Sequence, residues 1–141
     1  MKLKLIMLVS LFAFGLTFNA NAGSVVDADT DLVPDGFDNC LGLANGPNDD
    51  SNQVDSDQDG YGNACDSDYN DDGATTTLDF PFFLDAFTGA VPDAQTGHNG
   101  DGSTTTLDFT RFLNDFTGSA SPGPSGLSCA GHSPNPAPCL P

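Results

Sequence analysis

The stretch Asp55-Ser-Asp57-Gln-Asp59-Gly60 places acidic residues at alternate positions just before a glycine. Related spacings recur at four places, and the 20 acidic residues of the chain are all Asp. A looped backbone brings the short carboxylates at positions 1, 3 and 5 together, while the intervening side chains point away. Calcium takes about six to eight oxygen ligands at short range, so the pattern indicates calcium-binding loops. The alternative is a solvated acidic coil, the usual state of a charge run.

Residues 1–22 are typical of a secretory signal. Lys2 and Lys4 form a positive n-region, residues 5–18 form an apolar h-region, and Ala20-Asn21-Ala22 is a cleavage site. We expect cleavage near Ala22 and export to the periplasm or out of the cell. The apolar run is too short for a transmembrane helix, and no later stretch approaches the ~20 apolar residues required. The sequence therefore predicts a secreted protein with no membrane span.

The chain after this signal is strongly acidic. Arg111 is its only strong base against 20 Asp, which makes nucleic acid and anionic membrane poor partners. Val, Leu, Ile and Phe make up fewer than one in five of its residues, a level at which high charge predicts disorder. We therefore expect folding to depend on bound cations and disulfides.

The four cysteines contain no C-x-x-C pair, which disfavours a thiolate metal site. Three disulfide pairings are possible for four cysteines. We favour Cys40 with Cys65 and Cys129 with Cys139, because each pair brackets a compact segment. Residues 119–141 are rich in Pro, Gly and Ser, so we expect no regular structure there, and the second bridge would close this tail into a small loop.

A duplicated unit spans residues 68–118. Its segment from Asp72 to Phe80 recurs as Asp101 to Phe109, and the match continues to Gly89 and Gly118. In each copy apolar residues fall at i, i+3, i+4 and i+7, which predicts a short amphipathic helix. The two apolar faces either pack on each other as a core, which we favour, or form a binding face. They consist of Phe80, Phe83, Leu84 and Phe87, and of Phe109, Phe112, Leu113 and Phe116.

Local signals set the ends of these two helices. Thr76 with Asp79, and Thr105 with Asp108, match capping boxes in which Asp replaces Glu. The glycine that ends each copy is a stop signal. Pro81 fixes the start of the first helix near residues 78–80 or distorts its first turn.

Each predicted helix follows a loop that matches a twelve-residue EF-hand-type template. In the first, loop C (residues 68–79), Gly73 provides the sharp turn at position 6 and Ala74 offers its carbonyl at position 7. In the second, loop D (residues 97–108), Gly97 replaces the carboxylate at position 1, so we expect a weaker site unless Asp93 or a water substitutes. The predicted ligands are Asp68, Asn70, Asp72, Thr76 and Asp79 in loop C, and Asn99, Asp101, Thr105 and Asp108 in loop D.

A calcium loop followed by one helix, used twice, resembles a type I dockerin domain. The resemblance covers residues 68–118. It implies calcium at loop positions 1, 3, 5 and 12 and docking of the duplicated helices onto a cohesin domain. Dockerins typically tether secreted polysaccharide-degrading enzymes to a scaffold.

The preceding stretch, residues 27–68, resembles thrombospondin type 3 repeats. Its loop A (residues 27–38) is followed by the Asn39-Cys40 pair typical of that family, although Leu32 stands where Gly is expected at position 6. Asn45, Asn52 and Gln53 lie in the stretch that usually joins such loops, and loop B (residues 55–66) completes the pair. The resemblance implies repeats that wrap calcium with little hydrophobic core and are pinned by disulfides. The predicted ligands are Asp27, Asp29, Asp31, Asp35 and Asp38 in loop A, and Asp55, Asp57, Asp59, Asn63 and Asp66 in loop B.

Other chemistry is less well supported by the residues. A zinc role for His98 or His132 is an alternative to exposed side chains without a role, which we favour. Two Asp residues could serve as acid and base of a glycosidase, but that needs a cleft with perturbed carboxylates. Because the carboxylates here are assigned as calcium ligands in a small chain, we expect no enzyme. Asp66 closes loop B two residues before Asp68 opens loop C, so we expect these two sites to be coupled.

These inferences predict a small, mostly irregular and α-helical protein, with calcium-stabilised loops, two short amphipathic helices and disulfides. Its expected parts are a signal (1–22), thrombospondin-type loops (23–67), a dockerin-like pair (68–118) and a tail (119–141). Several calcium ions, four for four loops, are the expected cofactors. The expected role is an extracellular structural, adhesion or matrix module, favoured because no catalytic domain is attached. The alternative is an adaptor for a cohesin-like or polysaccharide-associated protein.

Overall fold

The computed structural model describes residues 25–91, 95–118, 121–131 and 139. In chain order they contain two 3-10 helices, η1 (Asp35–Phe37) and η2 (Asn63–Cys65), and two α-helices, α2 (Phe80–Phe87) and α3 (Thr106–Thr117). These described residues contain no strand, and none of their helices is long and apolar enough to cross a membrane. The predicted fold class, mostly irregular with two short helices and two disulfides, is confirmed. The predicted signal, Asp93 and His132 lie outside the described residues.

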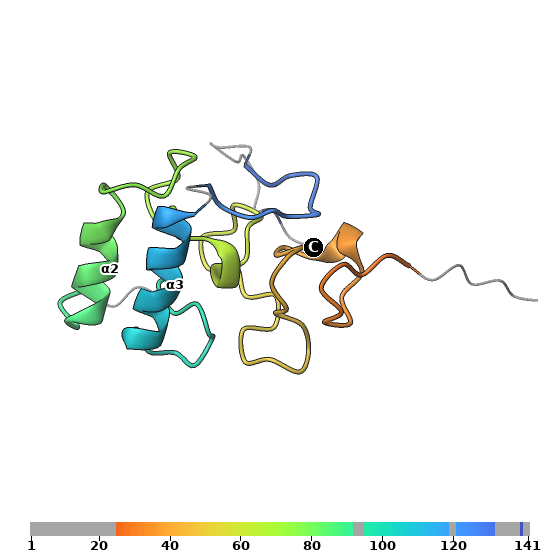
Figure 1. The fold of residues 1–141 in the computed structure, drawn as a ribbon, viewed down its shortest axis with the longest axis horizontal. Helices are drawn as coiled ribbons and strands as arrows, with labels where there is room; N and C mark the ends of the chain where they lie inside the picture. Colours follow the sequence, from red (N-terminus) through yellow and green to blue (C-terminus); the bar gives the residue numbers. More distant parts are fainter. Residues whose placement is uncertain (1–24, 92–94, 119–120, 132–138, 140–141) are drawn as a thin grey trace, which may run out of the picture.

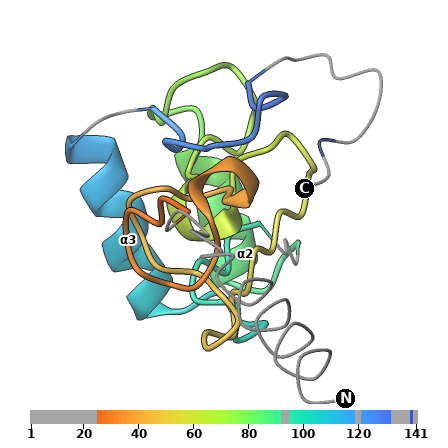
Figure 2. The same cartoon turned by 90° about the vertical axis from the view of Figure 1, so that its right-hand side faces the viewer.

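The two α-helices lie side by side at one end of the molecule, and the irregular Asp-rich chain fills the other end (Figure 1). Residues 121–131, drawn in blue, lie beside the orange segment that contains loop A, in this view and after a quarter turn (Figure 2), and are hydrogen-bonded to it. The molecule therefore has a helical half, which contains α2 and α3, and a loop half, which contains loops A and B. Residues 121–131 return to the loop half.

The helix α3 begins with the predicted capping box, in which Thr105 and Asp108 bond each other's backbone N–H groups. The helix α2 begins only at Phe80, although the corresponding Thr76 and Asp79 make the same kind of bonds. Pro81 explains the later start, because it corresponds to Thr110 of α3 but has no N–H group with which to bond the Thr77 carbonyl, as an earlier start would require. The predicted start near residues 78–80 is confirmed.

The two helices end differently, although each has a glycine at the predicted stop. Gly89 has a φ of 73° and donates to the Ala86 carbonyl, so it ends α2 in the left-handed conformation that glycine adopts readily. Gly118 has a φ of −99° and is needed for space, because an added Cβ would lie 2.6 Å from the Asn114 carbonyl oxygen.

The helical half has an aromatic core. Phe83 and Phe112 are each 2% exposed, and their ring centroids lie 5.5 Å apart. Phe109 packs against Phe83 from α3, and Tyr69 stacks on Phe112 from the start of loop C. The predicted packing of the two Phe-rich faces on each other is confirmed. Their outer residues stay 37–44% exposed: Leu84, Phe87, Leu113 and Phe116.

The loop half has a mostly polar interior. The predicted Cys40–Cys65 disulfide is present and packs with Ala64 and Leu43 into a small apolar cluster. Around it, the buried Asn45 donates to the Asn39 side chain at 2.8 Å, and Gln53 donates to the Asn45 side chain at 2.7 Å. Buried polar groups are tolerated when they are hydrogen-bonded, so this amide network supplements the small hydrophobic core.

His98 joins the two halves, and its predicted exposure is wrong. Its side chain is 4% exposed, and its Nδ1 lies 2.6 Å from the Asn63 carbonyl oxygen in loop B. Its Nε2 lies 2.8 Å from the Tyr69 hydroxyl. The Asn63 carbonyl oxygen can only accept, so Nδ1 carries a proton, and in the neutral ring Nε2 accepts from the Tyr69 hydroxyl. Burial also lowers the pKa of His98, so it serves as a neutral link in the interior.

Candidate metal centres

All four loops share one backbone conformation. Positions 4 and 6 of each loop have a positive φ, a combination that turns the chain around the loop centre. At position 4 the residues are Thr30, Gln58, Asp71 and Gly100, and at position 6 they are Leu32, Gly60, Gly73 and Gly102. The repeat seen in the sequence is therefore also a repeat of backbone geometry.

Leu32 stands at position 6 of loop A, where the repeat pattern expects Gly, and it adopts the same backbone conformation as the glycines. Leu32 has a φ of 81°, within the range of the three glycines at the same position. A residue with a Cβ pays of the order of 1–2 kcal/mol in this conformation. Loop A thus keeps its shape at an energetic cost.

The acidic side chains at positions 1 and 5 organise the loops by accepting backbone hydrogen bonds. In loops A, B and C the position 1 carboxylate accepts from the N–H of position 6, over 2.6–3.1 Å. In all four loops the position 5 carboxylate accepts from the N–H of position 7, over 2.8–3.2 Å. These bonds keep the carboxylates turned inward.

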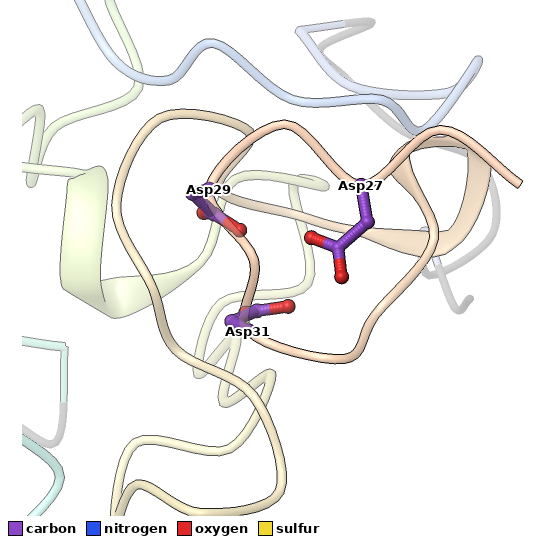
Figure 3. Close-up of side chains that lie close together, drawn as sticks. All are labelled: Asp27, Asp29 and Asp31. Atoms are coloured by element: carbon purple, nitrogen blue, oxygen red, sulfur yellow. The ribbon is translucent and has the colours of Figure 1, made fainter. Parts of the chain in front are cut away.

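Loops A and B each gather three carboxylates. One oxygen from each of Asp27, Asp29 and Asp31 lies within 4.8 Å of the others, and the same is true of Asp55, Asp57 and Asp59. The three side chains of loop A point into the space that the loop encloses (Figure 3). Both oxygens of Asp29 are buried and have no hydrogen-bond partner. A buried carboxylate without a donor is costly unless a cation compensates it, so this donor set suits calcium.

The raised pKa values of carboxyl groups in loop B also indicate a site for a cation. Partial burial and the neighbouring Asp55 raise the pKa of Asp57 to about 6. Partial burial, with a smaller contribution from Asp57, raises the pKa of Asp59 to about 7. Burial also raises the pKa of Asp66 and Asp29. Crowded negative charge of this kind is stabilised by a proton or by a bound cation.

The predicted ligands at positions 9 and 12 of loops A and B close the loop backbone. Asp35 accepts from the Ala28 N–H at 2.8 Å, and Asn63 accepts from the Ser56 N–H at 2.9 Å. At position 12, Asp38 and Asp66 are each 1% exposed. Asp66 accepts from the Asp68 N–H at 2.8 Å, so loop B is hydrogen-bonded to the first residue of loop C.

Loops C and D are completed by their helices. Asp79 accepts from Thr76 N–H and Asn70 N–H, and Asp108 accepts from the corresponding backbone groups of Thr105 and Asn99. Positions 3 of these loops are amides, and within the described part of the chain neither loop gathers three carboxylates as loops A and B do. In loop D the Asn99 amide donates to Asp101 at 2.9 Å, and Gly97 leaves position 1 without a carboxylate.

The sequence reasoning missed Gln95. Its amide donates to Asp57 at 2.5 Å and to Asp66 at 3.3 Å, so a residue between α2 and loop D hydrogen-bonds two carboxylates of loop B. Gln95 belongs to no repeat, and no local signal singles it out. Asp71 was also missed, although its pKa is raised by burial and by Asp57 nearby.

The comparisons with known proteins bear on the loop half and on loop C. A family model for the thrombospondin type 3 repeat matches residues 26–47 and 54–80. Searches of curated proteins and of solved structures each found no match. The segment from 26 to 80 therefore carries thrombospondin type 3 repeats, which are calcium-binding modules with Asp-rich loops. The match runs past the boundary predicted at residue 68 and includes all of loop C.

Proposed function

We propose that this protein is a secreted, non-enzymatic calcium-binding protein in which calcium organises the four Asp-rich loops. The observation that carries the proposal is the Asp29 carboxylate, which is buried without a hydrogen-bond donor and faces Asp27 and Asp31. The donor set supports calcium over zinc, because the predicted ligands are carboxylate, amide, hydroxyl and carbonyl oxygens, and His98 in loop D is instead bonded to Asn63 and Tyr69. The two disulfides support an oxidising location, the periplasm or the extracellular space.

Calcium then acts mainly as the folding cofactor, since binding energy at such loops is folding energy. Circular dichroism of the chain from residue 23 in chelator and in millimolar calcium tests this. We expect a gain of ordered structure and a higher melting temperature with calcium. Identical spectra and melting temperatures in the two buffers would contradict the proposal.

The number of ions tests the assignment of ligands to loops. We expect native mass spectrometry to count four calcium ions, or three if Gly97 abolishes binding by loop D. Asp29→Asn is expected to remove the ion of loop A. Asp49→Asn is the matched control, because it removes the same charge from an exposed position outside the loops. An equal loss in both variants would show that the count reflects general acidity.

The biological role that we favour is an extracellular structural, adhesion or matrix module. Its support is the formal charge of −17, carried by Asp-rich loops that calcium can neutralise and bridge. We expect calcium to promote reversible association of the chain with an acidic extracellular polymer, measured by cosedimentation. Association that persists in chelator would contradict this role.

A dockerin-type adaptor is the second candidate, and the exposed apolar side chains of α2 and α3 favour it. They border an apolar groove of 320 Å³ between the helices, lined by Phe80, Phe83, Leu84, Phe87, Thr106 and Phe109. Large exposed apolar patches commonly mark interaction sites. The partner would be a cohesin-like protein that docks on the two helices.

Binding to purified cohesin domains, followed by calorimetry in calcium, tests the adaptor role. We expect a complex of one to one that Phe87→Ser weakens. Val25→Ser is the control, since Val25 is also exposed but belongs to the loop half. Equal weakening by both variants, or no complex with any cohesin, would contradict the adaptor role.

The absence of catalysis rests on the assignment of the carboxylates as ligands. A glycosidase would need a pair of carboxylates at a substrate cleft, free to exchange protons. Hydrolysis of a polysaccharide that disappears with a single Asp→Asn substitution would contradict this part of the proposal.

A further inference from the structure

The end of the chain is bonded to both disulfide-linked loops. We call residues 121–131 together with Cys139 the C-terminal strap. Gly123 donates to the Cys65 carbonyl at 3.0 Å, and Gly126 donates to the Asp38 carbonyl at 2.8 Å. Pro124 accepts from the Leu41 N–H at 2.9 Å. The strap therefore crosses the points where loop A and loop B end.

The strap is also hydrogen-bonded to the turn of loop B between positions 4 and 5. The Cys139 N–H donates to the Gln58 carbonyl at 3.0 Å, and the Gly131 N–H donates to the Asp59 carbonyl at 3.3 Å. Gln58 is the left-handed residue at position 4, with a φ of 66°. Asp59 is the predicted ligand at position 5. Two strap amides thus fix the backbone that orients the carboxylates of Asp57 and Asp59.

Tyr61, at position 7 of loop B, packs closely against two glycines of the strap. A Cβ added at Gly123 would lie 2.7 Å from the Tyr61 ring, and one added at Gly131 would lie 2.7 Å from its hydroxyl oxygen. Both glycines also have a positive φ. Contacts this close leave no room for a side chain, so glycine at these two positions is what lets the strap seat against loop B.

A disulfide ties these contacts together. Cys139 is bonded to Cys129, which is two residues before Gly131. At Gly60 of loop B, an added Cβ would lie 2.5 Å from the Cys139 sulfur. The covalent link therefore keeps the N–H group of Cys139 close to the segment that carries the N–H group of Gly131.

We propose that the C-terminal strap, closed by the Cys129–Cys139 disulfide, is a positioning element for the calcium site of loop B. It holds the turn at Gln58 and Asp59 in the ligating conformation before calcium arrives. Pre-organisation of this kind raises affinity by removing the ordering cost from the binding step. The inference rests on calcium binding by loop B, and it adds that binding there depends on the oxidation state of a distant cysteine pair.

A calcium titration of the isotope-labelled chain, monitored through the backbone amide resonances, measures calcium binding by each loop separately. The position 6 amides are suited to this, because those of loops A, B and C donate to the position 1 carboxylate. Gly60 reports on loop B. Gly102 reports on loop D, whose own bonds run to Asp108 at the start of α3.

The first variant replaces both strap cysteines, Cys129→Ser with Cys139→Ser, and leaves Cys40–Cys65 intact. We expect the dissociation constant reported by Gly60 to rise about tenfold, the effect of losing roughly one to two net hydrogen bonds. The constant reported by Gly102 is expected to stay within about twofold.

The second variant, Gly131→Ala, keeps the disulfide and disturbs the contact with Tyr61. Its control is Gly89→Ala, which also places a side chain at a φ near 70° but in open space beside α2. We expect Gly131→Ala to weaken loop B and Gly89→Ala to leave it unchanged.

Three outcomes overturn the proposal. An unchanged calcium dissociation constant at Gly60 in both strap variants would show that the strap contacts loop B without affecting its calcium binding. Equal weakening at Gly60 and Gly102 would show general destabilisation. A wild-type chain that shows no calcium-induced shift at all would contradict the proposed function itself, and that result is distinguishable from the other two.

Discussion

Loops A and B share their backbone turn with loops C and D but differ from them after position 8. In loops A and B positions 9–11 form the 3-10 helices η1 and η2, and the position 9 side chain bonds the N–H of position 2. In loops C and D an α-helix comes next, and the position 12 Asp bonds the N–H of position 3. One metal loop can therefore be closed either by a disulfide-linked turn or by a helix.

Whether a loop is closed by a helix or by a disulfide-linked turn determines how much of the folding stability around it is independent of calcium. The helices bring Phe83 and Phe112 into contact, so the helical half has a hydrophobic core of its own. The loop half has Cys40, Cys65 and Ala64 at its centre, surrounded by amide groups and buried Asp. Buried carboxylates favour folding only when donors or cations compensate them. We therefore expect the two halves to differ in their dependence on the ion.

Removing calcium is the largest expected way to separate the two halves. A site saturated at about 100 times its dissociation constant contributes about 2.7 kcal/mol to folding, so losing loops A and B together costs about 5 kcal/mol. We expect amide hydrogen exchange in chelator to lose protection in residues 27–66 first. Phe83 and Phe112, with the helix amides around them, are expected to retain part of theirs. Equal loss in both halves would show that they fold as one calcium-dependent unit.

Truncating the aromatic core is expected to destabilise the helical half rather than the loop half. Phe83→Ala removes a ring that is 2% exposed, and we expect it to cost about 3–4 kcal/mol. Phe82→Ala on the same helix is the control, because Phe82 is 44% exposed. Chemical denaturation in saturating calcium measures both. A similar small cost for the two variants would mean that the Phe83 ring contributes little to the helical half.

The features predictable from the sequence were those set by local spacing. The repeat places Gly60, Gly73 and Gly102 at one loop position, and the capping residues with Pro81 set the helix starts. The cysteine pairing was also found, because each pair brackets a compact segment. The residues that decide these features are near one another in the sequence, and even the members of each disulfide are at most 25 residues apart.

The features that could not be predicted depend on contacts between distant segments. His98 looks exposed from its place in the weakest loop, but it is buried because Asn63 of loop B and Tyr69 of loop C supply hydrogen-bond partners. Gln95 reaches Asp57 across 38 residues of sequence. The Pro- and Gly-rich tail has no periodicity, so nothing in it predicts that it returns to loop B. Leu32 shows the reverse case, in which a residue that breaks the sequence pattern keeps the loop shape.

The pH dependence is expected to distinguish loop B from loop D. Asp57 and Asp59 have pKa values raised to about 6 and about 7, above the ~3.9 of the unfolded chain. In chelator, the stability that their protonation contributes is present below about pH 4 and is lost as the pH rises through 6 and 7. In calcium the sign reverses, because the ion needs the deprotonated ligands.

We therefore expect the calcium affinity of loop B to fall about tenfold or more between pH 8 and pH 5, since protons compete for its carboxylates. Loop D is expected to change less, because Gly97 and Asn99 occupy positions 1 and 3 and neither side chain titrates. Calcium titrations read from the Gly60 and Gly102 amides measure both. A parallel fall in the two loops would contradict the link between pH dependence and the carboxylate triad.

The smallest expected effect comes from exchanging residues at position 6. Leu32 carries a Cβ at a φ of 81° and is 67% exposed, so Leu32→Gly relieves backbone strain and sacrifices little burial. We expect a net gain of about 0.5–1 kcal/mol, the strain relieved less the added freedom of glycine in the unfolded chain. Gly73→Ala is the reciprocal control, since Gly73 has a φ of 92° with open space around it, and it is expected to lose about the same amount. Thermal melts in saturating calcium resolve both changes. If both variants lose stability, the Leu32 side chain makes a contribution to loop A that outweighs its backbone strain, and the two loop types differ at position 6 as well as in their closure.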